Sequence, residues 1–458
     1  MSGVMSPSAD TDSGTKSPQV ILDLSRLVYA GWSDTPKGIP RVELAYAEHL
    51  LLAFANEPAR LKFAICDAFG RHHILATATA TRFIRDISRA WRQDLSSQWT
   101  RWYLKLQTTA IHLALLPRWR ALLDRQIQRY DGPSVYVIAS QLHLEKPGFI
   151  ASLKRASNAK LVYVIHDIFL TQFPEFFPAE DVKHNRRRME NAARHADTIV
   201  FNSDDTRRAF VNTFARTGLA GEAIVAPLGV PVAASNATPS KPETAPYFVL
   251  IGTIEPRKNH YLVLTLWRRL REMFGEDTPR LILIGERGWK NEKVIDMLEN
   301  CTAMRGVVEE RGRLPDREMF AILAGARALL LPSIAEGYGL PLAEALAAGT
   351  PALCSDIPAL REVGRDVPEF LDPFDGAAWE AAIIDYAGET SARRHAQLER
   401  LRHWQAPSWG DHFRSVGPVL GISASPEKPA PARTARPGDE SADVCRPTPT
   451  IKQTARSP

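Results

Sequence analysis

The chain has few cysteines and no long apolar stretch. Its four cysteines lie far apart among 458 residues, and none belongs to a C-x-x-C pair. That distribution argues against a disulfide framework or a zinc site and fits a reducing compartment such as the cytoplasm. No apolar run approaches the roughly 20 residues that a membrane-spanning helix needs. Residues 1–18 are rich in small polar residues without an apolar centre, so we expect a disordered N-terminus rather than a signal peptide.

An excess of one charge is also lacking. The 57 Lys and Arg residues exceed the 52 Asp and Glu residues only enough to give a formal net charge of +5. Such a mild excess does not imply nucleic acid as a partner, and we expect none. The chain length and a hydrophobic fraction of 45% predict two globular domains. Residues 422–458 contain few large apolar side chains, so we expect a disordered tail there.

Short apolar runs alternate with helical patterns in both halves of the chain. Strand-like runs begin at Val20, Leu61, Val135, Leu161 and Thr198, and the pattern restarts with runs at Tyr247, Leu281, Ala328 and Pro351. This alternation predicts an α/β fold with two doubly wound parallel sheets. We expect domains at 19–235 and 246–400, joined by a linker at 236–245. A helical segment at 401–421 is expected to cross back to the first domain.

The densest motif follows the apolar run at Ala328 and reads P-S-I-A-E-G-Y-G-L-P-L-A-E-A from Pro332. Gly337 and Gly339 allow the backbone to approach a ligand, and the prolines and alanines after them predict a helix. The free amides and dipole of that helix start suit a phosphate, while the carboxylates of Glu336 and Glu344 can accept hydrogen bonds from sugar hydroxyls. Alternatively, the two glutamates merely favour the helix N-terminus electrostatically.

A second cluster, G-T-I-E-P-R-K-N-H from Gly252, directly follows the apolar run at Tyr247. Its adjacent Arg257 and Lys258 offer a planar guanidinium and a point charge, and both suit a diphosphate. The alternative is a solvated basic turn before a helix.

Together the two clusters resemble the retaining glycosyltransferases of family 4, which share the GT-B fold of two Rossmann-like doubly wound domains facing across a cleft. Glu336 and Glu344 match the E-x7-E motif of that family, and Gly252 to Asn259 match its phosphate loop in the form G-T-x-E-P-R-K-N. The resemblance covers most of residues 247–380. It includes Gly285, Gly288, Trp289, Gly312, Arg313, Leu314, Ser355, Asp356, Leu360, Arg361 and Glu362.

The resemblance implies that Glu336 contacts the donor sugar and Glu344 the ribose, while Arg257 and Lys258 bind the diphosphate as it leaves. Many relatives have a basic residue where this chain has Thr253. The remaining expected donor-binding positions are Gly252, Thr253, Gly337, Tyr338, Gly339 and Leu340.

The reaction implied is transfer of a hexosyl group, mannosyl or related, with retention. The donor would be a GDP- or UDP-sugar, and the acceptor a glycan or lipid-linked glycan of surface polysaccharide or lipopolysaccharide biosynthesis. No cofactor or metal is implied, because cations and a helix terminus can stabilise the leaving charge. The alternatives are a non-catalytic nucleotide-sugar-binding protein and a GT-B phosphorylase or epimerase.

In the N-terminal half, the family often has a His-Asp pair near the donor sugar, which here would be His166 and Asp167. The alternatives are a core histidine satisfied by the backbone and an aspartate that caps the next helix. Gly38 lies in the sequence G-I-P-R, which we expect in the loop after the first strand, either at the ligand or in a plain turn.

Basic residues are concentrated between residues 82 and 129. This stretch has ten Lys or Arg residues against three Asp residues, together with Trp91, Trp99, Trp102 and Trp119. Tryptophan beside cationic faces is typical of helices at an anionic membrane surface, here the inner membrane face. The alternative is an ordinary basic surface over tryptophans that lie in the core.

Overall fold

The computed structural model describes residues 17–31, 38–66, 72–92, 109, 121–122, 130, 132–145, 149–150, 159–231, 246–312 and 314–422. Several predicted features lie outside these residues. They are the N-terminus up to residue 16, the linker 236–245, the tail from residue 423, Arg313 and most of the basic stretch 82–129.

The described part of the N-terminal half forms one eight-stranded sheet, with the strand order β4-β3-β2-β1-β5-β6-β7-β8. Strand β3 pairs antiparallel with β2 and β4, and the other pairs are parallel. The strands are β1 (Gln19–Asp23), β2 (Leu61–Cys66), β3 (His72–Leu75), β4 (Ala121–Leu122), β5 (Ser134–Ile138), β6 (Lys160–Ile165), β7 (Thr198–Phe201) and β8 (Glu222–Val225).

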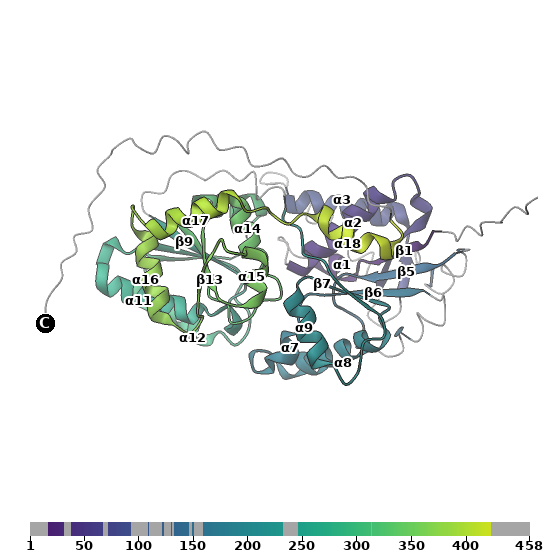
Figure 1. Ribbon diagram of the computed structural model, residues 1–458, viewed down its shortest axis with the longest axis horizontal. Coiled ribbons are helices and arrows are strands. Elements are labelled where there is room, and N and C mark those ends of the chain that lie inside the picture. Colours follow the sequence, from purple (N-terminus) through teal and green to yellow (C-terminus); the bar gives the residue numbers. More distant parts are fainter. Residues whose placement is uncertain are drawn as a thin grey trace, which may run out of the picture.

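The described part of the C-terminal half forms a second sheet of six parallel strands, in the order β11-β10-β9-β12-β13-β14. The strands are β9 (Tyr247–Ile251), β10 (Arg280–Ile284), β11 (Val308–Arg311), β12 (Ala328–Leu331), β13 (Ala352–Ser355) and β14 (Glu369–Leu371). The two sheets lie in separate lobes, as Figure 1 shows.

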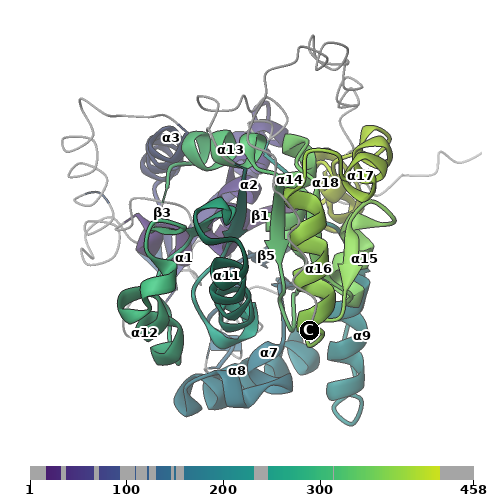
Figure 2. The ribbon, with the colours of Figure 1, turned by 90° about the vertical axis from the view of Figure 1, so that its left-hand side faces the viewer.

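Helices cover the sheets in both lobes (Figures 1 and 2). None of the helices in the described ranges is long and apolar enough to cross a membrane. The first lobe contains α1 (Ser25–Ala30), α2 (Gly38–Ala53), α3 (Thr77–Arg92), α7 (Phe169–Gln172), α8 (Ala179–His195) and α9 (Asp204–Thr213). The later helices are α11 (His260–Phe274), α12 (Glu292–Asn300), α13 (Asp316–Gly325), α14 (Leu340–Ala348), α15 (Pro358–Gly364), α16 (Gly376–Ala387), α17 (Ala392–Arg402) and α18 (Trp409–Leu420).

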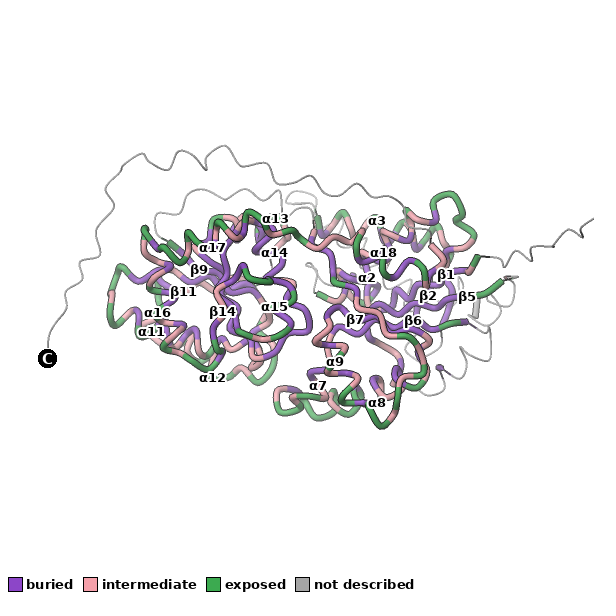
Figure 3. Tube along the Cα trace, in the orientation of Figure 1, coloured by how far each residue is buried: buried purple, intermediate pink, exposed green. Residues whose placement is uncertain are grey.

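The central strands are apolar because helices cover both faces of each parallel sheet. Every residue of β1, β5, β9 and β12 is buried. Figure 3 shows this burial as a buried band through the middle of each lobe. The expected α/β fold with two doubly wound sheets is therefore confirmed.

The last helix of the described residues, α18, packs on the N-terminal domain. His412 Nε2 lies 2.8 Å from the hydroxyl of Tyr46 in α2, and His412 Nδ1 lies 3.1 Å from the carbonyl oxygen of Ala226. The amide of Val230 donates to the carbonyl of Pro407 at 3.0 Å. The chain therefore returns to the first lobe, as Figure 1 shows for the yellow helix.

The order of the strands predicts where a ligand binds. In open α/β sheets, ligands bind at the carboxyl ends of the strands where the strand order reverses. The second sheet reverses between β9 and β12, and the first between β1 and β5. The loops that follow these four strands are therefore the positions at which a ligand is expected.

Candidate active site

The two glycine-containing motifs follow β9 and β12, the strands at which the second sheet reverses. Residues Pro256–Lys258 form a 3-10 turn, and Asn259 is left-handed with φ 55° before α11 begins. Gly339 has φ 101°, which favours glycine, and α14 begins at the next residue, Leu340. Gly337 needs to be glycine for a different reason, because a Cβ atom there would lie 2.1 Å from the carbonyl oxygen of His166.

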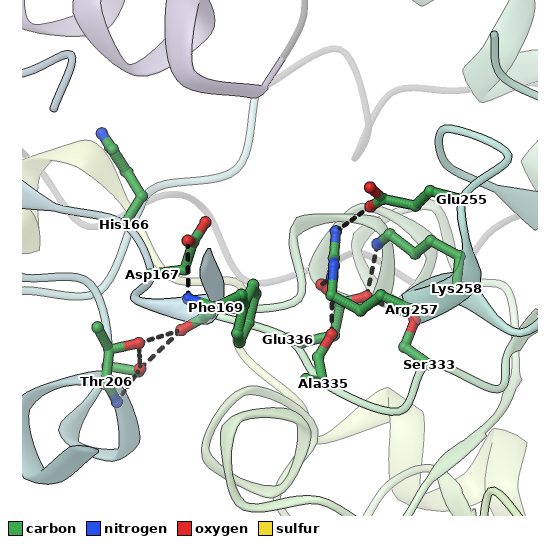
Figure 4. A network of polar contacts seen from close by, with 12 residues as sticks. His166, Asp167, Phe169, Thr206, Glu255, Arg257, Lys258, Ser333, Ala335 and Glu336 are labelled. Carbon is green, nitrogen blue, oxygen red and sulfur yellow. Dashed lines mark hydrogen bonds and ion pairs between the residues drawn. The ribbon is translucent and has the colours of Figure 1, made fainter. Parts of the chain in front are cut away.

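The carboxylate of Glu336 holds these two loops together (Figure 4). Its Oε1 accepts from Lys258 Nζ at 2.5 Å and from Ser333 Oγ at 2.6 Å, and its Oε2 accepts from Arg257 Nη1 at 3.1 Å. Burial opposes ionisation of this carboxyl, but Lys258 and Arg257 outweigh it and lower the pKa of Glu336 to about 2. Glu336 is therefore an anion at neutral pH.

The cations opposite Glu336 are buried as well. Burial lowers the pKa of the Lys258 ammonium, although Glu336 acts in the opposite direction. Arg257 also donates to Glu255 at 2.6 Å and to the carbonyl of Ala335 at 2.7 Å, and its guanidinium lies 4.9 Å from the ring centre of Phe169. Arg257 and Lys258 are thus not a solvated basic turn, which rules out that alternative.

Glu344 lies in α14 and pairs with the opposite domain. Its Oε1 accepts from Arg41 Nη1 at 2.7 Å, and Arg41 Nη2 also pairs with Asp316 of α13. Burial and the nearby Asp316 raise the pKa of Glu344, Arg41 opposes them, and the result is a pKa of about 7. A buried carboxyl with this pKa changes its charge close to neutral pH.

Both glutamates pair with cationic side chains of other elements, and neither lies in the first turn of α14, in which no acidic residue occurs. The alternative in which Glu336 and Glu344 act only on the helix N-terminus is therefore wrong.

His166 and Asp167 follow β6 in the N-terminal domain. The ring Nε2 of His166 lies 2.7 Å from the carbonyl oxygen of Ala139, so the backbone satisfies one of its two nitrogens. Burial lowers the pKa of His166 to about 4, which keeps the ring neutral at pH 7. Asp167 Oδ1 accepts from the amide of Phe169 at 3.3 Å, at the start of α7. Burial raises the pKa of Asp167, and Arg257 opposes this rise.

The loop that contains Glu336 contacts the N-terminal domain directly. The carbonyl of Gly337 accepts from Ser203 Oγ at 2.7 Å and from Thr206 Oγ1 at 3.0 Å. The Tyr338 hydroxyl donates to the carbonyl of Leu228 at 2.8 Å. These bonds bring the motif after β12 against α9 and the segments after β7 and β8, so residues of the N-terminal domain lie beside the loop that contains Glu336.

Two further residues of the resemblance also join the domains. Glu362 accepts from the backbone amides of Asp204 and Asp205 at 2.8 and 2.7 Å, at the start of α9. Trp289 Nε1 donates to the carbonyl of Phe176 at 2.8 Å.

The expected place of Gly38 is wrong. Gly38 is the first residue of α2 rather than part of the preceding loop, and a Cβ atom there would meet nothing within 4 Å. The helix can include Pro40 because amides in the first turn need no partner within the helix. The residue of this segment that reaches the site is Arg41, through Glu344.

The other expected residues lie close to Glu336 or at the turns that support it. Gly252 has φ 151° and adjoins the side chain of Lys258, and Thr253 packs beside Gly288.

Sequence reasoning missed Gln141 and Asn202, whose side chains form hydrogen bonds with the backbone of His166 and Asp167. They follow β5 and β7, and that position was the only available signal.

Known proteins with similar sequences identify the family. The sequence model of the protein family described as glycosyl transferases group 1 matches residues 233–396. The O-antigen chain mannosyltransferase B of Escherichia coli is 30% identical over 301 residues, which cover 63% of this chain and 73% of the relative. The chain belongs to the group 1 glycosyl transferases. It is therefore a glycosyltransferase. The serotype-specific mannosyltransferase WbdA of Escherichia coli is 25% identical over 266 residues, but this chain covers only 32% of WbdA.

Solved structures agree on the fold of this glycosyltransferase. Anabaena HepE, in complex with UDP, and sucrose-phosphate synthase from Thermosynechococcus elongatus each match with a TM-score of 0.55 and 15% identity. Each match covers 88% of this chain and 98% of the neighbour. At this identity the likeness shows the fold alone. The GT-B fold, with two Rossmann-like domains, is confirmed.

Proposed function

We propose that this glycosyltransferase is a retaining enzyme of family 4 that moves a mannosyl or related hexosyl group from a GDP- or UDP-sugar. Its acceptor is a glycan or a lipid-linked glycan, and its pathway builds a surface polysaccharide at the cytoplasmic face of the membrane. The observation that carries the proposal is the buried Glu336 carboxylate, which lies between Lys258 and Arg257 where the second sheet reverses. The names of the mannosyltransferase relatives support the choice of sugar and pathway.

In this proposal the two glutamates of the E-x7-E motif have different tasks. Glu336 accepts hydrogen bonds from hydroxyls of the donor sugar, and Glu344 accepts them from the ribose. Because Arg41 already pairs with Glu344, the ribose competes with a residue of the opposite domain for this carboxylate. Donor binding is thereby linked to the contact between the domains.

The cations stabilise the leaving group. As the glycosidic bond breaks, negative charge grows on the diphosphate, and the charges of Lys258 and Arg257 already lie in place without reorganisation. The amides of Tyr338, Gly339 and Leu340 at the start of α14 add further donors in this proposal. The diphosphate helps to deprotonate the acceptor on the same face of the sugar, so no carboxylate needs to attack. We expect activity without a divalent metal for the same reason.

A transfer assay tests the proposal. The enzyme is incubated with GDP-mannose, UDP-glucose or a dTDP-sugar and a short mannose-containing lipid-linked acceptor, with and without excess EDTA. We expect transfer from one of these donors, with the donor's anomeric configuration retained in the product by NMR. An inverted product, a requirement for added metal, or transfer only to inorganic phosphate or water would contradict the proposal, and the last outcome would favour a phosphorylase or epimerase.

We predict that Glu344→Ala weakens binding of the donor nucleotide by about 10- to 100-fold, because hydrogen bonds to charged groups contribute about 1.5–3 kcal/mol. Calorimetric titration with GDP and UDP measures the effect. Glu380→Gln is the control, because Glu380 lies on α16 and pairs with Arg269 of α11, away from the site. Equal affinity of Glu344→Ala and the wild type for the nucleotide that binds would contradict the role of Glu344.

We also propose that the basic stretch 82–129 draws the enzyme to anionic membrane. Within its described part, Arg82, Arg85, Arg89 and Arg92 lie exposed on α3. Trp91 is only 4% exposed and packs in the core, so the expectation that this tryptophan anchors at a membrane is wrong. The arginines of α3 supply an electrostatic attraction of about 1 kcal/mol for each basic residue near an anionic leaflet. Trp99, Trp102 and Trp119 lie outside the described residues.

We expect the protein to sediment with anionic vesicles at low salt and to be released as salt rises. Changing Arg82, Arg85 and Arg89 to Glu should reduce the bound fraction several-fold. The matched control changes Arg186, Arg402 and Arg414 to Glu, which are exposed on other helices and alter the net charge equally. Equal loss in both variants, or no binding by the wild type, would rule out a membrane surface on α3.

A further inference from the structure

The loop after β5 contains two residues in the left-handed region. Gln141 has φ 57° and His143 has φ 71°, a conformation that non-glycine residues with long side chains rarely adopt. Such residues gather at functional sites, where the surrounding structure holds them. Strand β5 adjoins β1 where the first sheet reverses, so this loop lies where a ligand of the N-terminal domain is expected.

With Gln141 in the left-handed conformation, its carboxamide lies against the backbone of His166 and Asp167, the two residues that follow β6. Oε1 accepts from the amide of His166 at 2.8 Å, and Nε2 donates to the carbonyl of Asp167 at 2.8 Å. Only 6% of Gln141 is exposed. A single buried side chain thus holds the peptide groups that precede His166 and follow Asp167, the two residues on which the N-terminal half of the site depends.

Two more bonds fix His166. Asn202, just after β7, donates from Nδ2 to the carbonyl of His166 at 2.9 Å, and the ring Nε2 lies 2.7 Å from the carbonyl oxygen of Ala139. A carbonyl oxygen only accepts hydrogen bonds, so Nε2 carries the proton of the neutral ring. Nδ1 is then an acceptor. Nδ1 makes no hydrogen bond with any described residue. It is not one of their unpaired side-chain atoms that are fully buried, so part of its surface is accessible.

We propose that Gln141 is a positioning residue for glycosyl transfer: with Asn202, it holds His166 so that Nδ1 accepts a hydrogen bond from a hydroxyl of the bound sugar. This inference rests on the proposed function. A neutral acceptor nitrogen fits a hydroxyl, because it neither repels a polar donor group nor attracts the diphosphate.

The same contacts couple the position of His166 to that of the loop that contains Glu336 and Gly337. Asn202 holds the carbonyl oxygen of His166, and this oxygen would lie only 2.1 Å from a Cβ atom added to Gly337. Gly337 adjoins Glu336. If the backbone of His166 moves, the loop that holds Glu336 must move too. Loss of the carboxamide should therefore reduce turnover more than it reduces donor binding.

The test compares two variants of Gln141 with a matched control. Gln141→Met keeps the length of the side chain and removes both bonds, whereas Gln141→Glu keeps an acceptor for the amide of His166 and loses the donor to Asp167. Gln397→Met is the control. Gln397 is also buried, and its carboxamide also makes two bonds, with Tyr386 and with the carbonyl of Ala352, in the C-terminal domain.

Two measurements are made on the full chain. Steady-state kinetics should show kcat lower by about 10- to 100-fold in both Gln141 variants, because small misplacements of reacting groups cost about this much. The donor KM should change by less than about threefold. NMR of ¹⁵N-histidine-labelled protein, with His166→Asn to assign the signal, should show protonated Nε2 and unprotonated Nδ1 in the wild type. This pattern should be lost or averaged in the Gln141 variants and kept in Gln397→Met.

Protonated Nδ1 in the wild type would overturn the inference, as would a loss of kcat in the Gln141 variants no larger than that in Gln397→Met. If Gln141→Met does not fold, Gln141→Glu decides by the same criteria. If the wild type transfers no sugar, the proposed function fails, while the protonation pattern of His166 in the wild type and the variants still decides whether Gln141 positions it.

Discussion

Replacing Lys258 with alanine should lower kcat by about 10²- to 10³-fold, the range found when one preorganised donor to a developing oxyanion is removed. Lys258 Nζ lies 2.5 Å from Glu336 and is almost fully buried, so its charge acts in a medium that screens it weakly. Because charge grows on the diphosphate only as the bond breaks, the donor KM should rise much less than kcat falls.

Steady-state kinetics with saturating acceptor measures both constants. Lys293→Ala is the matched control, because Lys293 is exposed on α12, away from Glu336. Circular dichroism should show that both variants fold. A rise in KM with unchanged kcat would mean that Lys258 contributes only to ground-state binding, which contradicts the role proposed for it.

Replacing Glu336 with glutamine should lower kcat by at least about 10²-fold. The amide has nearly the shape of the carboxylate but no charge, so Lys258 and Arg257 lose the anion that they share. The two buried cations then repel each other, and a hydrogen-bond acceptor for the sugar is lost as well. Glu380→Gln again serves as the control, and unchanged kcat in Glu336→Gln would contradict the assignment.

The stability of Glu336→Gln should depend on pH in a defined direction. In the folded protein the pKa of Glu336 is about 2, below its ordinary value of 4.5. The ionised group therefore stabilises the fold above pH 4.5, and this contribution is lost as the pH falls from 4.5 toward 2. Urea unfolding of the wild type and the variant should show a difference that is largest near neutral pH and shrinks below pH 4.5. A difference that grows on acidification would contradict the ion pairs.

Much of the fold could be predicted because buried parallel strands are continuous apolar runs. The runs at Val20, Val135, Tyr247 and Ala328 all became central strands. The missed strands lie at or near sheet edges or are short and polar. Examples are β8, β11 with its sequence V-E-E-R, and β14 with three residues. Pairing with a neighbouring strand, rather than the local pattern, fixes such segments.

The candidate site could be located from the sequence where one loop carries several of the expected residues, and its contacts were missed where distant loops meet. The loops after β9 and β12 could be recognised from their own residues. The pairing of Arg41 with Glu344 joins positions 303 residues apart, and no local pattern reports it. Likewise, Gln141 acts through a left-handed backbone conformation that its residue type does not favour.

Hydrogen–deuterium exchange with and without saturating GDP or UDP tests the central claim most directly, because it locates the nucleotide without altering the site. The account predicts that at least one of the two nucleotides slows exchange in peptides that cover Gly252–His260 and Ser333–Glu344. These peptides contain the amides at the start of α14 and the residues around Lys258 and Glu336. Protection confined to the N-terminal domain, or no change with either nucleotide, would contradict the donor site described above.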